Sequence, residues 1–355
     1  MVDAVAETAK AAEKVELSIG GSLYSGWKSI TISRSLDQVT GTFQLGLAWK
    51  GAATDAEFPI NQGDRCQVLI AGEPVIDGWI DAVEPSIDGT DHAIGVAGRD
   101  RTGDLADCSA IHKPGSWRNV KLEAIAAELA APFGISVTAK ASTGKPIVRF
   151  ALQQGETVQA AIERLLRFRG LLMAPAPGGN LEIITPDDGA PVATLELGVN
   201  VKAVRVRLDG SQRFSDYLIK GQSAGNNEKH GKTVSQIKGT ATDAGVTRHR
   251  PLLIVAEDQG DGASLATRAK FEAGVRAGKS TSADITVAGW RVSPGGKLWD
   301  RNMPVRVKCA AAKLPDQKML VTAVTYQKDD SGTTATLTVM PPGAWKQLAE
   351  SERAK

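Results

Sequence analysis

Apolar and polar residues alternate along several short stretches near the start of the chain, beginning with 15–19 and 27–33. Period-two alternation puts successive side chains on opposite faces of a strand, so each stretch predicts a strand with one buried face. Further stretches of this kind are 42–49, 66–70, 75–83 and 92–97. Asp88-Gly89-Thr90 predicts a tight turn before the last of them, because glycine tolerates a positive φ. These short strands predict a small β-barrel or sandwich over residues 15–105.

Helical spacing replaces this alternation over residues 106–195. Apolar residues recur there at intervals of three and four, which places them along one face of a helix. The two stripes are Leu122, Ile125, Ala126, Leu129 and Ala130, and then Val158, Ala161, Ile162, Leu165 and Leu166. Thr157 is the expected N-cap of the second helix, and Gly170 is its expected stop. Because a hairpin is also expected around 177–180, this region is predicted to be an α+β module.

Strand-like alternation returns over residues 196–345, which form a second predicted β region. Two insertions are expected within it: a polar, glycine-rich loop over 226–245 and an alanine-rich helix over 263–278. The two ends of the chain, 1–14 and 346–355, are polar and are expected to be flexible.

A weak internal repeat links the two β regions. In both, a short strand is followed by a loop, a longer strand, a glycine turn and a final strand. The corresponding segments are 65–69, 78–83, 88–90 and 93–96 in the first region, and 305–308, 320–324, 331–333 and 335–339 in the second. Short strand patterns also recur by chance, so this order leaves both duplication and coincidence open. The predicted fold class is mainly β, with two similar small β-barrels plus inserted helical and hairpin modules.

Composition narrows the class of protein. Lys plus Arg is 42 and Asp plus Glu is 40, so the net charge is +2, whereas a protein that coats DNA would carry a strong basic excess. No apolar run approaches the ~18 residues that a membrane helix needs, so no stable membrane insertion is expected. Cys66, Cys108 and Cys309 are scattered, which fits reduced thiols better than a disulfide framework or a zinc site.

Motifs for catalysis and metal binding are not recognisable in the sequence. The four histidines show no HxH or HxxxH spacing, and none has a cysteine at ligand spacing. Residues 258–262 resemble a calcium loop only in outline and lack its later glutamate, so a polar turn is expected there. The pairs Asp187-Asp188 and Asp329-Asp330 flank glycines in expected turns and do not indicate the two carboxylates of a glycosidase. No enzyme, metal or cofactor is therefore predicted.

Five residues are candidates for an interface or a channel. Arg99 and Arg101 lie in the corner that ends the first predicted barrel, where an ion-paired structural turn is expected. Arg205 and Arg207 share one face of a strand, and they either line a channel or lie on an ordinary wetted face. Trp299 is the candidate interface anchor, because tryptophan is enriched at interface hot spots.

Four stretches resemble one protein family. They are Gly63-Asp64-Arg65-Cys66-Gln67-Val68, Gly78-Trp79-Ile80, Gly98-Arg99-Asp100-Arg101-Thr102-Gly103-Asp104-Leu105, and Ala288-Gly289-Trp290 through Leu298-Trp299. Their order resembles that of the baseplate hub proteins of contractile-tailed phages, and most of all the hubs of Mu-like phages, in the group of T4-type hub and late control protein D-like proteins. The resemblance implies a structural protein without enzymatic activity, built from two similar barrels with smaller attached modules.

The resemblance also implies an assembly. Hub proteins of this type form a homotrimer, so three chains with two barrels each make a pseudo-sixfold ring between the sixfold tail tube and the threefold spike. The implied partners are the tail tube protein, the central spike protein and, in the axial channel, a tape-measure protein or DNA. The implied location is the tail baseplate of the virion, after synthesis in the host bacterial cytoplasm.

Two other functions stay open from the sequence. One is a tail-associated peptidoglycan hydrolase, whose expected sign would be a paired-carboxylate or metal constellation. The other is a cell-wall-binding module formed by the two helices and the hairpin of 106–195.

Overall fold

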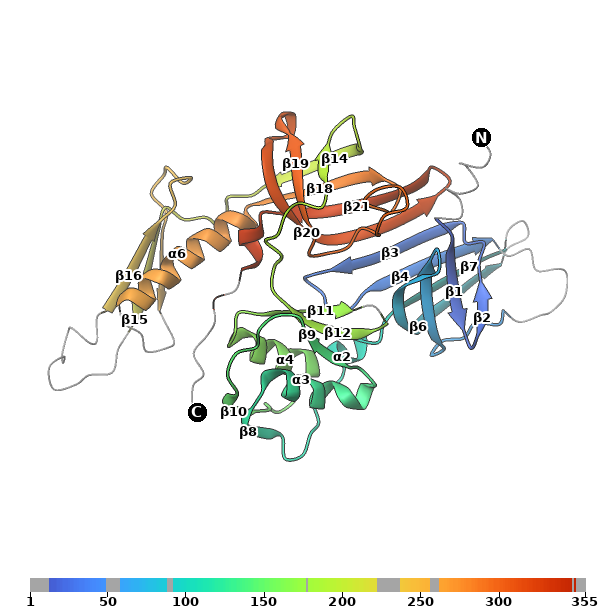
Figure 1. The fold of residues 1–355 in the computed structure, drawn as a ribbon, viewed down its shortest axis with the longest axis horizontal. Helices are drawn as coiled ribbons and strands as arrows, with labels where there is room; N and C mark the ends of the chain where they lie inside the picture. The colour runs from blue at the N-terminus through green and yellow to red at the C-terminus, as the bar shows by residue number, and fades with distance from the viewer. Residues whose placement is uncertain are drawn as a thin grey trace.

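In the computed structural model the chain is built mainly of β-strands, with few helices (Figure 1). The structure describes residues 13–48, 58–87, 92–176, 178–221, 237–255, 262–346 and 348. The mainly β fold class predicted from the alternation of apolar and polar residues is confirmed. The largest sheet runs through both β regions, and smaller sheets belong to the attached modules.

One sheet of 13 strands forms the body of the molecule. Its strands are β1 (Val15–Ile19), β2 (Ser22–Tyr24), β3 (Ser29–Ser35), β4 (Thr42–Ala48), β5 (Arg65–Ile70), β6 (Glu73–Ile87), β7 (His92–Asp100), β13 (Thr194–Glu196), β14 (Val201–Leu208), β18 (Thr281–Ala288), β19 (Pro304–Cys309), β20 (Leu314–Asp329) and β21 (Gly332–Met340). The main path through the sheet is β14-β18-β21-β20-β3-β4-β7-β6-β5-β1-β2. Two short helices follow strands of the second half: η2 (Ala310–Ala312) and η3 (Pro342–Trp345).

The two β regions have the same strand arrangement. β5, β6 and β7 are successive antiparallel neighbours, and β19, β20 and β21 repeat this order. β4 pairs with β7 as β18 pairs with β21, and β3 pairs with β4 as β14 pairs with β18. A register shift falls at the same place in both long strands, between Ile80 and Ala82 in β6 and between Val321 and Ala323 in β20. The internal repeat inferred from the sequence is therefore present in the fold.

The two halves are joined edge to edge within one chain. The joint between them is the antiparallel pairing of β3 with β20, which runs from Ser35 opposite Ala323 to Ile30 opposite Lys328. Buried side chains from both halves belong to one hydrophobic cluster. Because apolar burial is the main favourable contribution to folding, this shared core makes the two halves a single packed body.

The α+β module follows the first half and packs below the joint in the view of Figure 1. Its elements are α2 (Gly103–Asp107), β8 (Ser116–Val120), α3 (Leu122–Ala130), η1 (Ala131–Phe133), β9 (Val137–Ala139), β10 (Ile147–Ala151), α4 (Val158–Arg167), β11 (Leu172–Ala176) and β12 (Asn180–Ile184). Both predicted helices and the predicted hairpin are confirmed, and both apolar stripes are buried in the module's own core. Thr157 caps α4 as expected, since its hydroxyl accepts the Ala160 amide at 3.2 Å.

A smaller unit projects from the second half (Figure 1). It consists of β15 (Asp216–Gly221), β16 (Ile237–Thr242), β17 (Pro251–Val255) and the helix α6 (Gly262–Lys279). The unit has its own small core, formed by Tyr217, Ile219, Leu265, Ala269 and Ala273.

The structure confirms the helix predicted over 263–278 but not the whole loop predicted over 226–245, because β16 occupies residues 237–242. The glycine-rich composition of this range suggests a loop. Gly239, however, faces α6 so closely that an added Cβ would lie 2.1 Å from the Leu265 carbonyl carbon. This glycine therefore does not form a turn. It allows the helix α6 to pack closely against the strand β16.

Several expectations concern residues outside the described ranges. They are most of the flexible N-terminus 1–14, Trp49 of the stretch 42–49, the turn 88–90, Pro177 of the hairpin, residues 226–236 of the expected loop, residues 258–261 of the calcium-like segment, and most of the C-terminal tail 346–355. In the ranges that are described, no helix has both the length and the apolar character needed to cross a bilayer.

Candidate assembly surfaces

The main sheet has one face packed on the core and one face of polar side chains. The polar face continues across the joint between β3 and β20. There the hydroxyl oxygens of Ser33 on β3 and Thr325 on β20 lie 3.0 Å apart. Farther along the sheet, the Thr338 hydroxyl donates to the Asp284 carboxylate at 2.8 Å. On this face, hydroxyl groups therefore form hydrogen bonds across neighbouring strands, with another hydroxyl at Ser33 and with a carboxylate at Asp284.

Arg205 and Arg207 extend the polar face at its β14 edge. Both are exposed, while Val204 and Val206 pack against the core from the other side of the strand. Arg207 Nη2 contacts Asp209 Oδ2 at 3.0 Å, with 78% of the arginine side chain still exposed. The structure therefore brings the two predicted arginines together on the uncovered side of the sheet.

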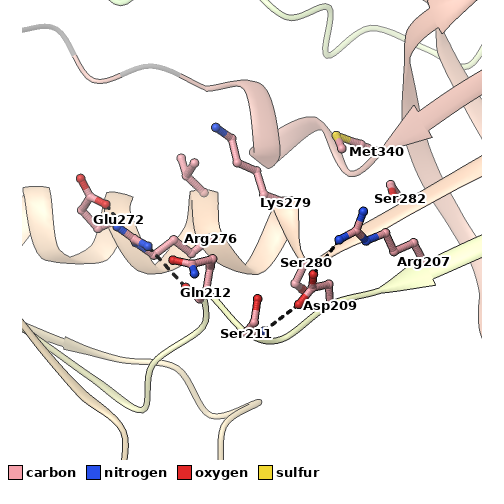
Figure 2. Close-up of a pocket in the computed structure, with 11 residues that line it drawn as sticks. Arg207, Asp209, Ser211, Gln212, Glu272, Arg276, Lys279, Ser280, Ser282 and Met340 are labelled. Atoms are coloured by element: carbon pink, nitrogen blue, oxygen red, sulfur yellow. Dashed lines mark hydrogen bonds and ion pairs between the residues drawn. The ribbon is translucent and has the colours of Figure 1, made fainter. Parts of the chain in front are cut away.

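A pocket of about 410 Å³ opens next to Arg207, between the end of β14 and the helix α6 (Figure 2). Arg276 and Lys279 line its helix side. Asp209 lies on the other side, where hydrogen bonds from Ser211 and Arg207 lower the pKa of its carboxyl group to about 2. The pocket therefore combines three cations with two carboxylates, Asp209 and Glu272, of which Glu272 pairs with Arg276 at 3.3 Å.

Arg99 holds the end of β7 through two carboxylates. Its Nε donates to Asp81 at 2.7 Å, and its Nη2 contacts Asp107 at 2.9 Å. Hydrogen bonds with both carboxylates raise the pKa of Arg99 above its usual range. The expected ion-paired corner is present, and it connects the first half to α2.

Arg101 connects the first half to the α+β module. Its Nη1 donates to the Gly134 carbonyl at 2.9 Å and its Nη2 to the Gly178 carbonyl at 2.5 Å. Its Nε also lies 3.6 Å from Asp77. Both corner arginines are thus engaged within the chain, and a role for them between chains stays a prediction.

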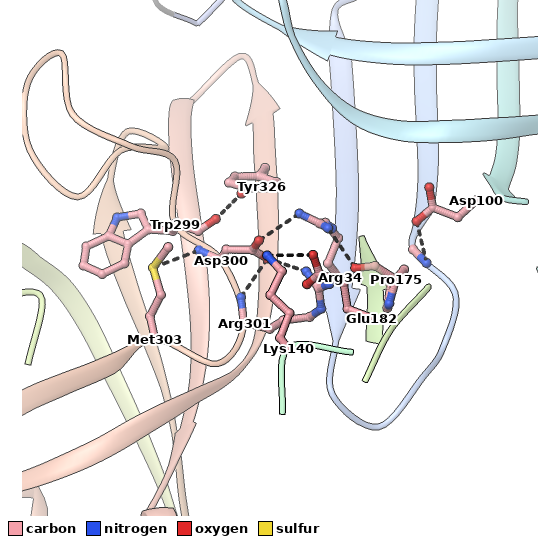
Figure 3. A network of polar contacts seen from close by, with 11 residues as sticks. Arg34, Asp100, Lys140, Pro175, Glu182, Trp299, Asp300, Arg301, Met303 and Tyr326 are labelled. Carbon is pink, nitrogen blue, oxygen red and sulfur yellow. Dashed lines mark hydrogen bonds and ion pairs between the residues drawn. The ribbon is translucent and has the colours of Figure 1, made fainter. Parts of the chain in front are cut away.

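Two buried arginines meet where the two halves and the α+β module come together (Figure 3). Arg34 on β3 and Arg301 before β19 are 5% and 7% exposed. Arg34 Nη1 donates to one Asp300 oxygen at 3.1 Å, and Arg301 Nη1 donates to the other at 2.8 Å. Arg34 also donates to the Pro175 carbonyl of β11 at 3.3 Å. One carboxylate therefore accepts hydrogen bonds from two cations at the point where three parts of the chain meet.

Burial dominates the electrostatics of this cluster. It lowers the pKa of Arg301, and the positive charge of Arg34 acts in the same direction. It also raises the pKa of Tyr326, whose hydroxyl donates to the Trp299 carbonyl (Figure 3). No local sequence pattern indicates the Arg34 contact, because its partners Pro175 and Asp300 are distant in the chain.

Asp100 is a second buried carboxylate near the joint, at 2% exposure. Its two oxygens accept the backbone amides of Gly41 and Asp77, each at 3.0 Å. Burial raises the pKa of Asp100 to about 6, against the opposing effects of Arg34 and of the two amides. Asp100 thereby ties the end of β7 to β6 and to the turn after β3.

Trp299 is 2% exposed and belongs to the hydrophobic core of its own chain. Its side chain offers almost no surface to a second chain. This placement does not favour the predicted role of interface anchor, which stays a prediction.

Among the described residues, no group of three or more His, Cys, Asp or Glu side chains is placed to hold a metal ion. The three cysteines are free. Burial raises the pKa of Cys66 to about 12, which makes it a poor nucleophile.

The fold is that of phage tail proteins. It matches the 43 kDa tail protein of prophage MuSo2 from Shewanella oneidensis with a TM-score of 0.85 and 37% identity, over 95% of this chain and 100% of that one. The tail protein from Neisseria meningitidis MC58 has the same fold, with a TM-score of 0.78 and 24% identity over 94% of this chain and 97% of that one.

Sequence comparison supplies the family. Residues 14–100 match the profile "Mu phage baseplate assembly protein GpP-like, N-terminal", and 102–185 match "Baseplate hub protein gp44-like, second domain". Residues 213–272 match "Tail protein NMB1110-like, third domain", and 262–348 match "Mu phage baseplate assembly protein GpP, fourth domain". The baseplate hub protein gp44 of Escherichia phage Mu is 32% identical over 347 residues, 96% of this chain and 90% of that protein. The chain belongs to the family of Mu-type baseplate hub proteins.

Proposed function

We propose that this chain is a structural, non-enzymatic hub protein that forms a homotrimeric ring between the tail tube and the central spike of a contractile tail. The observation that carries the proposal is the joining of two similar β halves into one sheet through β3 and β20. Three such chains supply six similar units. A ring of three therefore suits a sixfold tube on one side and a threefold spike on the other.

The polar face of the main sheet suits the lining of an axial passage. The opposite face is occupied by the core, so only the polar face is free to meet a partner that passes through. A surface of hydroxyl groups with charges of both signs, such as Arg205 and Asp284, has no excess of one charge to hold a charged polymer. This favours transit of a tape-measure protein or DNA over retention of either.

The predicted segments suggest a division of roles. Residues 15–105 and 196–345 would supply the ring, and 106–195 would form a module packed on its outside. The apolar stripes of this module are buried in its own core, and Arg101 fixes it to the first half. This arrangement supports packing more than recognition of the cell wall. The working place of the protein would be the virion tail baseplate, after synthesis in the host cytoplasm.

The test is the mass of the purified chain in solution, measured by light scattering after size exclusion over a series of dilutions. We expect a species of three times 37.3 kDa, with a central hole in electron micrographs. A chain that stays monomeric at every concentration, also when mixed with the spike protein, would overturn the trimer.

A further inference from the structure

The small sheet of the projecting unit, residues 213–279, has two open edges (Figure 1). Its strands lie in the order β16-β15-β17, so among the described residues β16 and β17 each pair on one side only, with β15. An open edge exposes backbone amides and carbonyls that can pair with another strand. Proteins usually protect such an edge with charged residues, with proline or with a covering element.

The two edges differ in their protection. The face of β16 that points away from α6 carries one lysine and two threonines, Lys238, Thr240 and Thr242. β17 instead has four consecutive apolar residues, 252–255. Leu253 and Val255 are 51% and 68% exposed. The β16 edge is therefore polar, whereas the β17 edge is apolar and open.

The helix α6 covers the small sheet unevenly. It packs mainly against β16 and β15 and has few contacts with β17. On the helix side, Leu252 and Ile254 of β17 reach the core of the unit but are only partly buried. An apolar strand that is uncovered at its edge and incompletely covered on both faces is a template for the addition of another strand.

The projecting unit is basic. Its residues 213–279 hold eleven Lys and Arg against seven Asp and Glu, a net charge of +4 in a chain whose total is +2. Lys220 and Lys238 are direct cross-strand neighbours, and Lys220 also lies opposite Val255. Both lysines are exposed, and neither forms an ion pair with a described residue. Because like charges opposite each other repel, an anion near this pair would be stabilised.

We propose that the β17 edge binds an extended segment of another protein, in which apolar and polar residues alternate between acidic ends. The segment adds to the small sheet as a fourth strand beside β17. Its apolar side chains cover Leu253 and Val255, and its carboxylates lie near the exposed cations at the two ends of β17, Arg248 and Lys220. In strand addition of this kind, main-chain hydrogen bonds supply affinity and side chains supply specificity.

The edge itself favours this occupant over two others. A nucleic acid would be attracted by the positive charge but would leave the apolar side chains of β17 exposed. A second copy of this chain would bring another unit of net charge +4, which the first would repel. An acidic segment with alternating apolar residues matches both the charge and the apolar edge. This inference goes beyond the proposed function, because the surface belongs to one chain and does not depend on the ring.

Fluorescence anisotropy with a labelled peptide tests the proposal on the whole chain. The peptide has the one-letter sequence DEVTVTVED, with three valines between acidic ends. We expect it to bind, and Leu253→Lys should raise its dissociation constant roughly tenfold or more. The matched control is Thr240→Lys, since Thr240 lies in the same row as Leu253 on the other side of β15. This control should leave the dissociation constant within about twofold of the wild-type value, and circular dichroism verifies that both variants are folded.

Two further peptides separate charge from apolar contact. KKVTVTVKK keeps the valines but reverses the charge, and it should bind roughly tenfold more weakly or worse. Lys220→Glu should shift the preference toward this basic peptide. DETSTSTED keeps the acidic ends without the valines and should also bind weakly. With DEVTVTVED bound, hydrogen exchange should slow in β17 and stay unchanged in β16.

The outcomes distinguish the possible occupants. Absence of binding by DEVTVTVED at about 1 mM overturns the proposal. Equal binding by DETSTSTED or by an oligothymidylate also overturns it, and would identify a general surface for polyanions. Self-association that is lost in Leu253→Lys would assign the edge to a second copy instead. Light scattering of the same samples reports the trimer separately, so failure of peptide binding leaves the proposed ring standing.

Discussion

Ser33 and Thr325 lie 292 positions apart in the chain, and their hydroxyl oxygens are 3.0 Å apart. They mark the line along which two similar half-sheets become one, through pairing of β3 with β20. The same line is reinforced from the core side by Arg34, which reaches from β3 to Asp300. The joint therefore has a polar contact on each face of the sheet, and its stability decides whether the two halves behave as one body.

Asp300→Asn should destabilise the joint strongly. The change removes the carboxylate charge that Arg34 and Arg301 both contact, and breaking a buried ion pair in this way costs about 3–5 kcal/mol of unfolding free energy. Urea denaturation followed by tryptophan fluorescence measures the loss. As a control, Asp316→Asn breaks the exposed ion pair with Arg306 and should change stability far less. Equal effects of the two substitutions would show that the buried cluster contributes no more than a surface pair.

Asp100 should make stability depend on pH. Its pKa is raised from 3.8 to about 6, so the folded state binds this proton more tightly than the unfolded state does. The corresponding stabilisation is complete below pH 3.8 and is lost as the pH rises through 6. Relative to Asp100→Asn, the wild type should therefore lose about 2.4 kcal/mol between pH 4 and pH 7.

Urea denaturation of both proteins over this pH range measures the difference. The asparagine side chain can accept a hydrogen bond from only one of the two backbone amides that Asp100 binds. The stability lost in this way does not vary with pH. A difference that stays constant from pH 4 to pH 7 would mean that Asp100 is ionised throughout.

Arg101→Met should loosen the α+β module from the first half. The substitution keeps most of the side-chain length but removes two hydrogen bonds to carbonyls and the contact with Asp77. Hydrogen bonds that involve a charged group contribute about 1.5–3 kcal/mol each, and the exposed bond to Gly134 should contribute less than the part-buried bond to Gly178. Hydrogen exchange should become faster in β11 and β12 while α6 is unchanged. Arg118→Met is the matched control and should leave exchange as in the wild type.

Gly239→Ala should displace α6 from β16. The new methyl group would lie 2.1 Å from the Leu265 carbonyl carbon, and a backbone atom cannot yield as a flexible side chain can. Overpacking of this kind costs about 1–3 kcal/mol. Exchange of the α6 amides reports the loss. Gly210→Ala has open space around the added carbon, so it should be neutral or slightly stabilising.

The spacing of apolar residues predicted those helices and strands that bury only one face. The stripes from Leu122 and from Val158 became the buried faces of α3 and α4, and the alternation around Ile30 and Ile32 became β3. Short strands such as β8 and β10 escaped prediction, since neither shows clean alternation of burial. β16 escaped because its glycine serves packing against a helix that comes later in the chain.

The candidate surfaces were only partly predictable. Arg205 and Arg207 share a face because two residues apart on a strand always do. Arg34 gave no signal, because a buried arginine is recognised by its partners, and Asp300 and Pro175 lie far away in sequence. Trp299 was chosen from its residue type alone; its indole lies in the core, and its role as an interface anchor stays a prediction.

The pairing of β3 with β20 has a consequence for folding during translation. The ribosome releases β3 early, but its partner begins at Leu314, close to the end of the chain. At roughly 5–20 residues per second, the edge of β3 stays uncovered for much of translation. An uncovered edge is a template for wrong pairing with other nascent chains. Premature termination before β20 should therefore yield fragments that aggregate through the uncovered edge of β3.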